Sequence, residues 1–457
     1  MQKNVSDGLP LPQRYGAIAT IVIGISMAVL DGAIANVALP TIAKDLNASP
    51  ASSIWIVNAY QIAIVISLLS LSFLGDMFGY RRVYQCGLVV FTLTSLFCAL
   101  SDSLHTLTLA RIAQGFGGAA LMSVNTALIR LIYPHRHLWR GIGINSFIVA
   151  VSSAAGPTIA AAILSVASWQ WLFAINVPLG IVAIFFALRY LPENGPKNTM
   201  PRFDLPSAVM NALTFGLLIT ALSGFAQGQS LSLITTEIVA MLIIGFFFVR
   251  RQLALPVPLL PVDLLRIPLF SLSICTSICS FCAQMLALVA LPFFLQSVIG
   301  RSEVETGLLL TPWPLATMVM APLAGYLIER VHAGLLGAIG LVVMAVGLFS
   351  LALLPASPGD LDIIWRMILC GAGFGLFQSP NNHTIITSAP RHRSGGASGM
   401  LGTARLLGQS TGAALVALMF NLAGQNATQV ALITAGTLAT LAAVISGLRV
   451  TQPKAQA

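Results

Sequence analysis

Hydrophobic residues in this chain form long runs that are separated by short polar segments. Runs of about 20 apolar residues, the length of an α-helix that crosses a bilayer, recur fourteen times. The pattern predicts an all-α polytopic membrane protein with fourteen transmembrane helices, near 15–38, 54–74, 82–101, 105–131, 141–165, 171–191, 206–226, 232–250, 269–297, 305–327, 333–355, 362–387, 397–421 and 429–449.

Composition and charge sharpen this prediction. Only 8% of residues are charged and 57% are hydrophobic, whereas a soluble domain carries about 25% charged residues. The first run is long and is interrupted by Asp31, so we expect a membrane span and not a cleaved signal peptide. The formal charge of +9 is informative through its placement, and we expect no nucleic-acid partner.

The polar segments alternate in charge along the chain. One set has only Lys44 and Arg301, and the other carries Lys3, Arg14, Arg81, Arg82, Arg130, Arg136, Arg140, Arg189, Lys197, Arg202, Arg250, Arg251, Arg266, Arg330, Arg391, Arg393, Arg449 and Lys454. Cationic loops face the cytoplasm, so we expect both termini there. An even number of helices agrees with that topology.

The chain also contains an internal repeat. Four features recur in the same order about 252–256 residues apart: VALP at 37–40 and 289–292, an acidic–basic turn at Asp76 and Glu329, an arginine that opens a Gly-rich helix at Arg111 and Arg366, and a basic turn at 135–137 and 391–393. Repeats of this kind build transporters whose site lies between two halves at mid-membrane.

The repeat predicts the domain organisation. We expect a six-helix bundle over 1–195, two inserted helices over 196–250, a Pro-rich cytoplasmic connector over 251–268 and a second six-helix bundle over 269–457.

Asp31 is the carboxylate that lies clearly within the hydrocarbon, and a charge there usually marks a functional site. If VALP ends the first helix, Asp31 lies about seven residues before that end and Arg111 about seven residues into the fourth helix, both roughly 10 Å deep. Burial and a nearby arginine act in opposite directions on a carboxylate's protonation. Because arginine stays charged, Asp31 is the candidate proton carrier. The alternative is a purely structural buried ion pair.

Several motifs resemble those of the fourteen-helix drug:proton antiporter branch of the major facilitator superfamily. They are LDGAIANVALP at 30–40, GDMFGYRR at 75–82, RIAQGFGGAAL at 111–121, SSAAGPTIAAA at 152–162, WQWLFAINVPLG at 169–180 and GMLGTARLLGQSTGAA at 399–414. The resemblance covers the whole chain and implies proton-driven export across a bacterial inner membrane. It also implies proton-coupling roles for Asp31 and Arg111, and it implies no cofactor beyond the proton gradient.

The resemblance assigns two further elements. A cytoplasmic gate would be formed by Asp76, Gly79, Arg81 and Arg82, with Glu329 and Arg330 in the second half. Ser72 and Met77 stand where the family pattern usually has Gly and Arg. The alternative to a gate is a topology signal with a solvated acid.

Gly156 and Pro157 belong to the antiporter motif, in which alanines replace the trailing glycines. The alternative there is ordinary close packing of small residues.

Ligand sites combine apolar surface with a few polar groups. We expect about half of the following residues to line such a cavity: Asn36, Tyr60, Gln61, Gln114, Asn125, Asn145, Phe147, Gln284, Trp313, Gln378, Asn381 and Gln409. The others would form interhelical hydrogen bonds or face lipid. Lack of further intramembrane acids argues against a dication exporter and leaves neutral, monocationic and anionic amphiphiles open.

The sequence therefore predicts a monomeric, proton-coupled antiporter that exports amphipathic small molecules by alternating access. A dedicated metabolite exporter and a transporter-like sensor are the alternatives. No Walker-type loop suggests ATP-driven transport, and no clustered nucleophile or paired acids suggest an enzyme. We predict no metal site, because Cys275, Cys279 and Cys282 fit apolar packing better than metal binding.

Overall fold

The computed structural model describes residues 8–134, 138–193, 203–226, 228–255, 258–328, 330–355, 358–389 and 394–451. Within these ranges the chain is helical and contains no strand. The first bundle comprises α1 (Leu11–Asp45), α2 (Pro50–Ser53), α3 (Trp55–Phe78), α4 (Tyr80–Ala99), α5 (Leu104–Ile132), α6 (Leu138–Leu164), α7 (Trp171–Ala174) and α8 (Asn176–Tyr190).

A helical hairpin and a second bundle follow. The hairpin consists of α9 (Leu205–Ala226) and α10 (Leu231–Ala254), and the 3₁₀ turn η2 (Val262–Arg266) leads out of it. The second bundle comprises α11 (Pro268–Phe293) with the π-helical turn η3 (Phe294–Val298), α12 (Glu303–Leu310), α13 (Pro312–Leu327), α14 (Ala333–Ala352), α15 (Asp360–Ser388), α16 (Ser394–Ala423) and α17 (Ala427–Leu448).

The predicted all-α polytopic fold is confirmed, since in the described residues thirteen helices or paired helices are long and apolar enough to cross a membrane. The predicted span at 362–387 is not among the thirteen, although α15 has 29 residues. Polar residues such as Asn381, Asn382 and His383 dilute its apolar character. It packs against α13 and α14, inside the second bundle.

The prediction that VALP ends the first helix is wrong. Pro40 lies inside α1, which continues to Asp45, and Pro292 lies inside α11. A proline in a membrane helix is tolerated where neighbouring helices satisfy the backbone groups that it frees. Next to the Asn36 carbonyl, which loses its helical donor to Pro40, the carbonyl of Val37 accepts a hydrogen bond from Gln296 Nε2 at 3.2 Å.

The two bundles share a packing scheme that reflects the repeat. In the first, α5 approaches α4 so closely at Gly117 that an added Cβ would lie 2.6 Å from the backbone nitrogen of Phe91. In the second, Gly373 of α15 meets α14 in the same way, 2.4 Å from the nitrogen of Met344. Glycine allows these close helix–helix approaches, as is common in membrane bundles.

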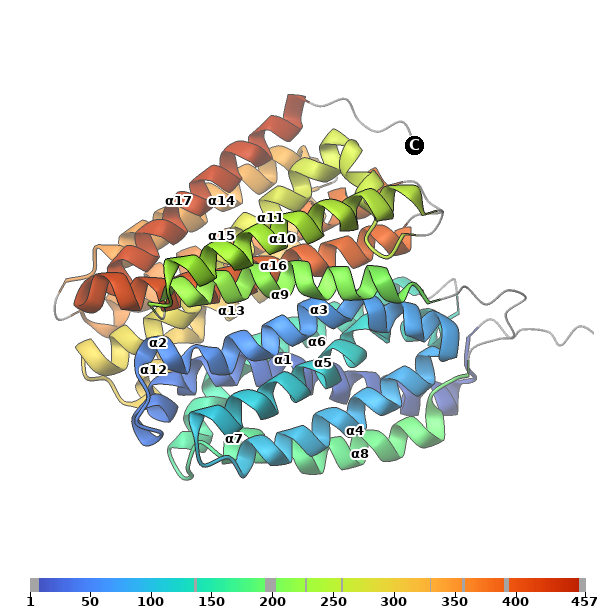
Figure 1. The fold of residues 1–457 in the computed structure, drawn as a ribbon, viewed down its shortest axis with the longest axis horizontal. Coiled ribbons are helices and arrows are strands. Elements are labelled where there is room, and N and C mark those ends of the chain that lie inside the picture. The colour runs from blue at the N-terminus through green and yellow to red at the C-terminus, as the bar shows by residue number, and fades with distance from the viewer. Residues whose placement is uncertain are drawn as a thin grey trace, which may run out of the picture.

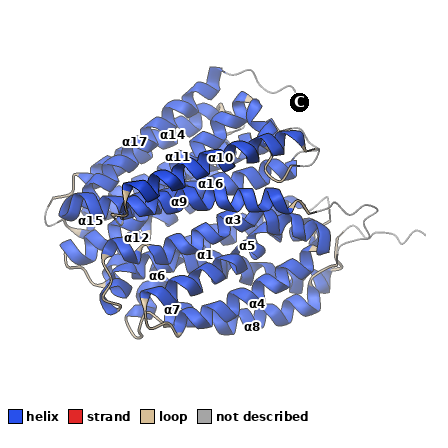
Figure 2. Cartoon of the chain, viewed as in Figure 1, coloured by secondary structure: helices blue, strands red, loops and turns tan. Residues whose placement is uncertain are grey.

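The bundles meet along α3 and α16, along α6 with α12 and α13, and along α1 and α11. Figure 1 shows the second bundle tilting away from the first toward the end where the C-terminus lies. We call this the basic end, because Arg81 at the start of α4 and Arg251 near the end of α10 lie there. The opposite end carries the end of α1 and the start of α12 (Figure 2).

The inserted hairpin is not peripheral to this interface. Helix α9 packs against both α3 and α16, so it contacts both bundles (Figure 1). Asn211 of α9 donates to the carbonyl of Ile66 at 3.1 Å. Helix α10 packs on α9 and leaves most of its surface exposed, with Leu242, Phe246 and Phe247 on the outside. That apolar exterior suits contact with lipid.

Candidate functional site

Asp31 lies in the middle of α1, on the side that faces α5 and α8. Its side chain has no solvent exposure, and its Oδ2 pairs with Nη1 of Arg111, which is equally buried. Its Oδ1 accepts hydrogen bonds from Gln114 Nε2 at 2.9 Å and Asn176 Nδ2 at 3.1 Å. Three helices, α1, α5 and α8, therefore meet at this carboxylate.

The structure brings Asp31 and Arg111 together, but not for the reason of equal depth that the sequence suggested. Because α1 runs on to Asp45, Asp31 lies about four turns from the end of its helix, whereas Arg111 lies about two turns into α5. The helices therefore bring the two side chains together without matching distances from their ends.

Arg111 also ties α5 to α3. Its Nε donates to the carbonyl of Ile56 at 3.0 Å, and its guanidinium lies 4.2 Å from the ring centroid of Tyr60. A second ring, Phe173, lies 5.5 Å away. Cations over aromatic faces are stabilised by the ring quadrupole. The charge on Arg111 thus contributes to the positions of α1, α3 and the segment that leads into α8.

Gln114 is central to the network and not part of the cavity wall. Besides donating to Asp31, its Nε2 donates to Ser95 Oγ at 2.8 Å, and its Oε1 accepts from Arg111 Nη1 at 2.6 Å. Our expectation that Gln114 contacts ligand is therefore wrong. The residue is i+3 to Arg111 on α5, so it shares the inward face of that helix.

A cavity of about 550 Å³ lies between the two bundles. It is lined from the first bundle mainly by α1, α3 and α6 and from the second mainly by α11, α13, α15 and α16. Pockets of roughly 300–1,000 Å³ hold small-molecule ligands. The volume suits a drug-sized molecule, and both bundles would contact it.

Most of the expected lining residues do face this cavity. Those found in its wall are Asn36, Tyr60, Gln61, Asn145, Gln284, Trp313, Gln378 and Gln409. Apolar contact is provided by aromatic and aliphatic neighbours that the sequence did not single out, among them Phe281, Met285, Leu288 and Phe374.

Three other expectations about lining residues fail. Phe147 is 58% exposed on the outside of α6, where lipid would cover it. Asn381 is buried inside the second bundle, where its Oδ1 accepts from Arg449 Nη1 at 2.6 Å and its Nδ2 donates to Ser277 Oγ at 2.7 Å. Asn125 lies behind the wall and donates to Asn145 Oδ1 at 2.8 Å.

Asp31 itself does not line the cavity. Its neighbours Ala28, Gly32 and Ala33 on α1 do line it. Tyr60 joins the two places: its ring packs under Arg111, its hydroxyl donates to the carbonyl of Ala28 at 3.3 Å, and its side chain lines the cavity. Tyr60 thus contacts both Arg111, the partner of Asp31, and the space that a ligand would occupy.

Sequence reasoning missed Arg405. This residue of α16 lines the cavity, and its buried Nε has no hydrogen-bond partner. The signal was present in the sequence, since a lone arginine in the middle of an apolar run marks a functional site by the same argument that identified Asp31.

The expected gate residues lie at the turn between α3 and α4. Gly79 has φ +102°, a conformation that glycine adopts without steric cost. Tyr80 donates to Asp76 Oδ1 at 2.6 Å, and Arg81 bonds Glu193 Oε1 at 3.2 Å and the carbonyl of Leu188 at 2.7 Å. These contacts all stay within the first bundle.

The remaining gate residues add little to this picture. Arg82 is exposed, and Arg330 donates to Tyr326 Oη at 2.6 Å. Glu329 lies outside the described residues. The described contacts therefore do not join the two halves of the expected gate, whose role stays a prediction.

Gly156 and Pro157 of the antiporter motif lie where α6 touches both bundles. A Cβ at Gly156 would lie 2.5 Å from Cβ of Ala33 on α1, and Pro157 lines the cavity. The carbonyl of Pro157 meets Gly307 of α12 so closely that a Cβ on Gly307 would lie 2.5 Å from it. Small residues thus permit the contact between α6 and the second bundle.

Toward the opposite end, side chains link the two bundles directly. Thr41 donates to Glu303 Oε1 at 3.2 Å, and the hydroxyl oxygens of Thr158 and Thr311 lie 2.8 Å apart. On the side of the cavity toward the basic end, Asn145 and Asn382 face the space. The bundles are therefore joined at the opposite end, in agreement with the divergence seen in Figure 1.

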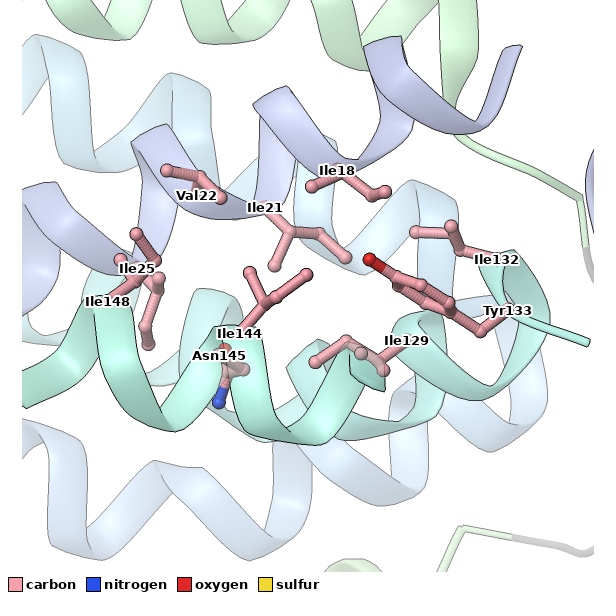
Figure 3. Close-up of a pocket in the computed structure, with 11 residues that line it drawn as sticks. Ile18, Ile21, Val22, Ile25, Ile129, Ile132, Tyr133, Ile144, Asn145 and Ile148 are labelled. Carbon is pink, nitrogen blue, oxygen red and sulfur yellow. The ribbon is translucent and has the colours of Figure 1, made fainter. Parts of the chain in front are cut away.

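A second, much smaller pocket lies between α1, α5 and α6 (Figure 3). Its free space is about 10 Å³, and Ile18, Ile21, Ile129, Ile144 and other aliphatic side chains surround it. That space is about the minimum for one water molecule. It is a packing gap and not a ligand site.

Comparison with known proteins agrees with the fold. The sequence model of the Major Facilitator Superfamily matches residues 21–413. The chain is 82% identical over 457 residues, the full length of both chains, to "Uncharacterized transporter YebQ" of Escherichia coli (strain K12).

More distant relatives carry functional names. "Riboflavin transporter RibZ" of Clostridioides difficile (strain 630) is 29% identical, with 90% of this chain and 89% of the relative covered. "Multidrug resistance protein Stp" of Mycobacterium tuberculosis (strain CDC 1551 / Oshkosh) is 30% identical, with 86% and 73% covered.

Among solved structures, a POT family transporter in complex with 5-aminolevulinic acid superposes with a TM-score of 0.72 at 14% identity, over 97% of each chain. That likeness concerns the fold alone. The matched family, the relatives and the two-bundle fold agree, and the chain belongs to the Major Facilitator Superfamily as a multi-pass membrane transporter.

Proposed function

We propose that this transporter is a proton-coupled antiporter that exports amphipathic small molecules, as a multidrug-type efflux pump does. It would act as a monomer in a bacterial inner membrane with both termini in the cytoplasm. The observation that carries the proposal is the buried Asp31–Arg111 pair, against which Tyr60 packs while it also lines a ligand-sized cavity between the bundles.

The positions of the bundle contacts support alternating access. The hydroxyl contact between Thr158 and Thr311 and the bond from Thr41 to Glu303 join the bundles at the opposite end. If the basic end is cytoplasmic, as cation placement suggests, this arrangement corresponds to a cavity that is closed from outside. Export would then require these contacts to break and others to form at the basic end.

Coupling between proton and cargo would be indirect. Asp31 has no surface on the cavity, so a ligand cannot compete with a proton for its oxygens. Protonation of Asp31 would remove the charge that holds Arg111. Arg111 anchors Ile56 and lies over the ring of Tyr60, so its movement would displace α3 and the cavity wall.

The driving force is sufficient for export. One pH unit supplies about 1.4 kcal/mol per proton, and a potential of 100 mV adds about 2.3 kcal/mol for each charge moved. The sum, about 3.7 kcal/mol, sustains a gradient of roughly several hundred-fold for a neutral cargo exchanged with one proton.

The test is proton movement in liposomes that contain the purified protein and a trapped pH-sensitive dye. Candidate cargoes are added to vesicles that hold an imposed pH gradient, and their addition should dissipate it. Asp31→Asn should abolish this response. Asp204→Asn, the same change in the α9–α10 hairpin, is the matched control and should keep it. Undiminished cargo-dependent proton movement in Asp31→Asn would refute the assignment.

A dedicated metabolite exporter is the second candidate, because a relative at 29% identity is named as a riboflavin transporter. The same assay separates the two. Responses to many unrelated amphiphiles support the multidrug proposal, whereas a response confined to one compound, with riboflavin as the first to try, supports the metabolite exporter.

A further inference from the structure

Arg405 is the single charged side chain among the described residues that line the main cavity. It lies in α16, and Gln409, one turn later, lines the same wall. Its Nε is buried and has no hydrogen-bond partner. No hydrogen bond or ion pair joins its side chain to another described residue.

Three other arginines within the described parts of the bundles have polar or charged partners, although one nitrogen of Arg111 and one of Arg366 are also unpaired. Arg111 pairs with Asp31, and Arg366 pairs with Asp362 Oδ1 at 2.5 Å. Arg449 is satisfied by neutral groups, since it donates to Ser446, to Asn381 Oδ1 at 2.6 Å and to Ser273 Oγ at 3.1 Å. Arg405 is only partly buried, since it lines the cavity. A cation at membrane depth without polar partners is unfavourable, so its side chain can accept a partner that the described residues do not supply.

The surroundings of Arg405 fit a cargo that carries one anionic group. Tyr60 and Gln61 of the first bundle line the same space. Phe281, Trp313 and Phe374 supply aromatic surface for an apolar body. Because Asp31 is already paired with Arg111, Arg405 contributes the uncompensated charge at the cavity.

We infer that the guanidinium of Arg405 binds an anionic group, a carboxylate or sulfonate, on an amphipathic aromatic cargo. The inference rests on the proposed function, since it takes this cavity as the cargo site. Arginine suits such a partner because its planar fork forms two parallel hydrogen bonds to a carboxylate. A cationic cargo would instead place two like charges together in a site of low dielectric.

The test is a binding comparison that does not depend on proton coupling. Three probes share one naphthalene ring and differ in the end group: 1-naphthaleneacetate, 2-(1-naphthyl)ethanol and 2-(1-naphthyl)ethylammonium. Isothermal titration of the purified full chain should give at least tenfold tighter binding of the carboxylate than of the alcohol. The ammonium probe should bind most weakly.

Variants assign the preference to the side chain. Arg405→Gln should bring the carboxylate and the alcohol within twofold of each other, and Arg405→Lys should keep part of the preference because it keeps the charge. Asn421→Ala is the control in the same helix, because Asn421 is exposed near the end of α16 and is not part of the cavity wall, and it should keep the full preference.

The outcomes are decisive because the wild-type comparison needs no variant to fold. Equal binding of the three probes, tighter binding of the ammonium probe, or failure of the carboxylate to bind overturns the inference. So does a full preference in a folded Arg405→Gln variant. None of these results bears on the Asp31→Asn proton assay, so each proposal fails separately.

Discussion

The Asp31–Arg111 pair predicts strongly non-additive effects on stability. Arg111 is fully buried and its one charged partner is Asp31. Asp31→Asn would therefore leave a buried charge without its partner, at a cost of about 3–5 kcal/mol. In Arg111→Gln the carboxylate would keep the bonds from Gln114 and Asn176, so its cost should be smaller.

The double variant Asp31→Asn/Arg111→Gln removes both charges and should be less destabilised than the sum of the single variants by about 2–3 kcal/mol. The measurement is equilibrium unfolding of the purified protein in mixed dodecyl maltoside and SDS micelles, followed by helical circular dichroism. If the effects of the two changes add within about 0.5 kcal/mol, the charges do not act as a pair and the reasoning fails.

The chain offers a matched control pair. Asp362 and Arg366 of α15 have the same chemistry at 2.5 Å, but their side chains keep 34% and 13% of their exposure. Exposed pairs of this kind contribute about 0–1 kcal/mol, so Asp362→Asn and Arg366→Gln should each be mild, with little coupling. A cost comparable with that of Asp31→Asn would show that the assay reports something other than burial.

Two further predictions concern packing and pH. Gly156→Ala would place a Cβ 2.5 Å from Cβ of Ala33 and should cost about 1–3 kcal/mol of unfolding free energy by overpacking. Gly216→Ala, with no atom within 4 Å of the added Cβ, should be neutral or slightly stabilising in thermal unfolding. Equal effects of the two changes would contradict the close approach of α1 and α6. The Arg251 guanidinium, which bonds both carboxylate oxygens of Asp204 at 2.8 and 3.2 Å, lowers the pKa of Asp204 below its ordinary value of 3.8. A carboxylate whose pKa is lower in the folded state stabilises the fold at pH values above its unfolded-state pKa. The wild type should therefore exceed Asp204→Asn in thermal stability at pH 7, and this difference should disappear as the pH falls below 3.8. A stability difference that does not change with pH would exclude the Asp204–Arg251 pair as its cause.

The helices and their order were predictable because a bilayer imposes a length and a polarity on each span. All fourteen expected segments correspond to helices or paired helices, and the ends agree to within a few residues at most positions. The exception is α1, where VALP was taken as a stop although Pro40 lies inside the helix. Proline is a dependable stop in water, where no neighbouring helix satisfies the carbonyl that it frees.

Charge made Asp31 and Arg111 visible in the sequence, because an ion in hydrocarbon is costly and therefore rare. The same argument would have found Arg405, which lies in a run that also carried a family motif. The sequence did not reveal the donors Gln114 and Asn176, since neutral amides occur throughout these helices and their spacing does not say which of them reaches a carboxylate.

The sequence by itself determined that this chain is a repeated bundle of membrane helices with a buried acid and a matching arginine. Only the tertiary structure decided which face of each helix points where. Gln61 lines the cavity, Gln114 holds Asp31, and Phe147 lies on the exterior. Lipid tails are as apolar as a protein core, so a membrane helix carries little amphipathic pattern to give its orientation. That information lies in the packing of the helices, which also places Tyr60 against Arg111 and in the wall of the cavity.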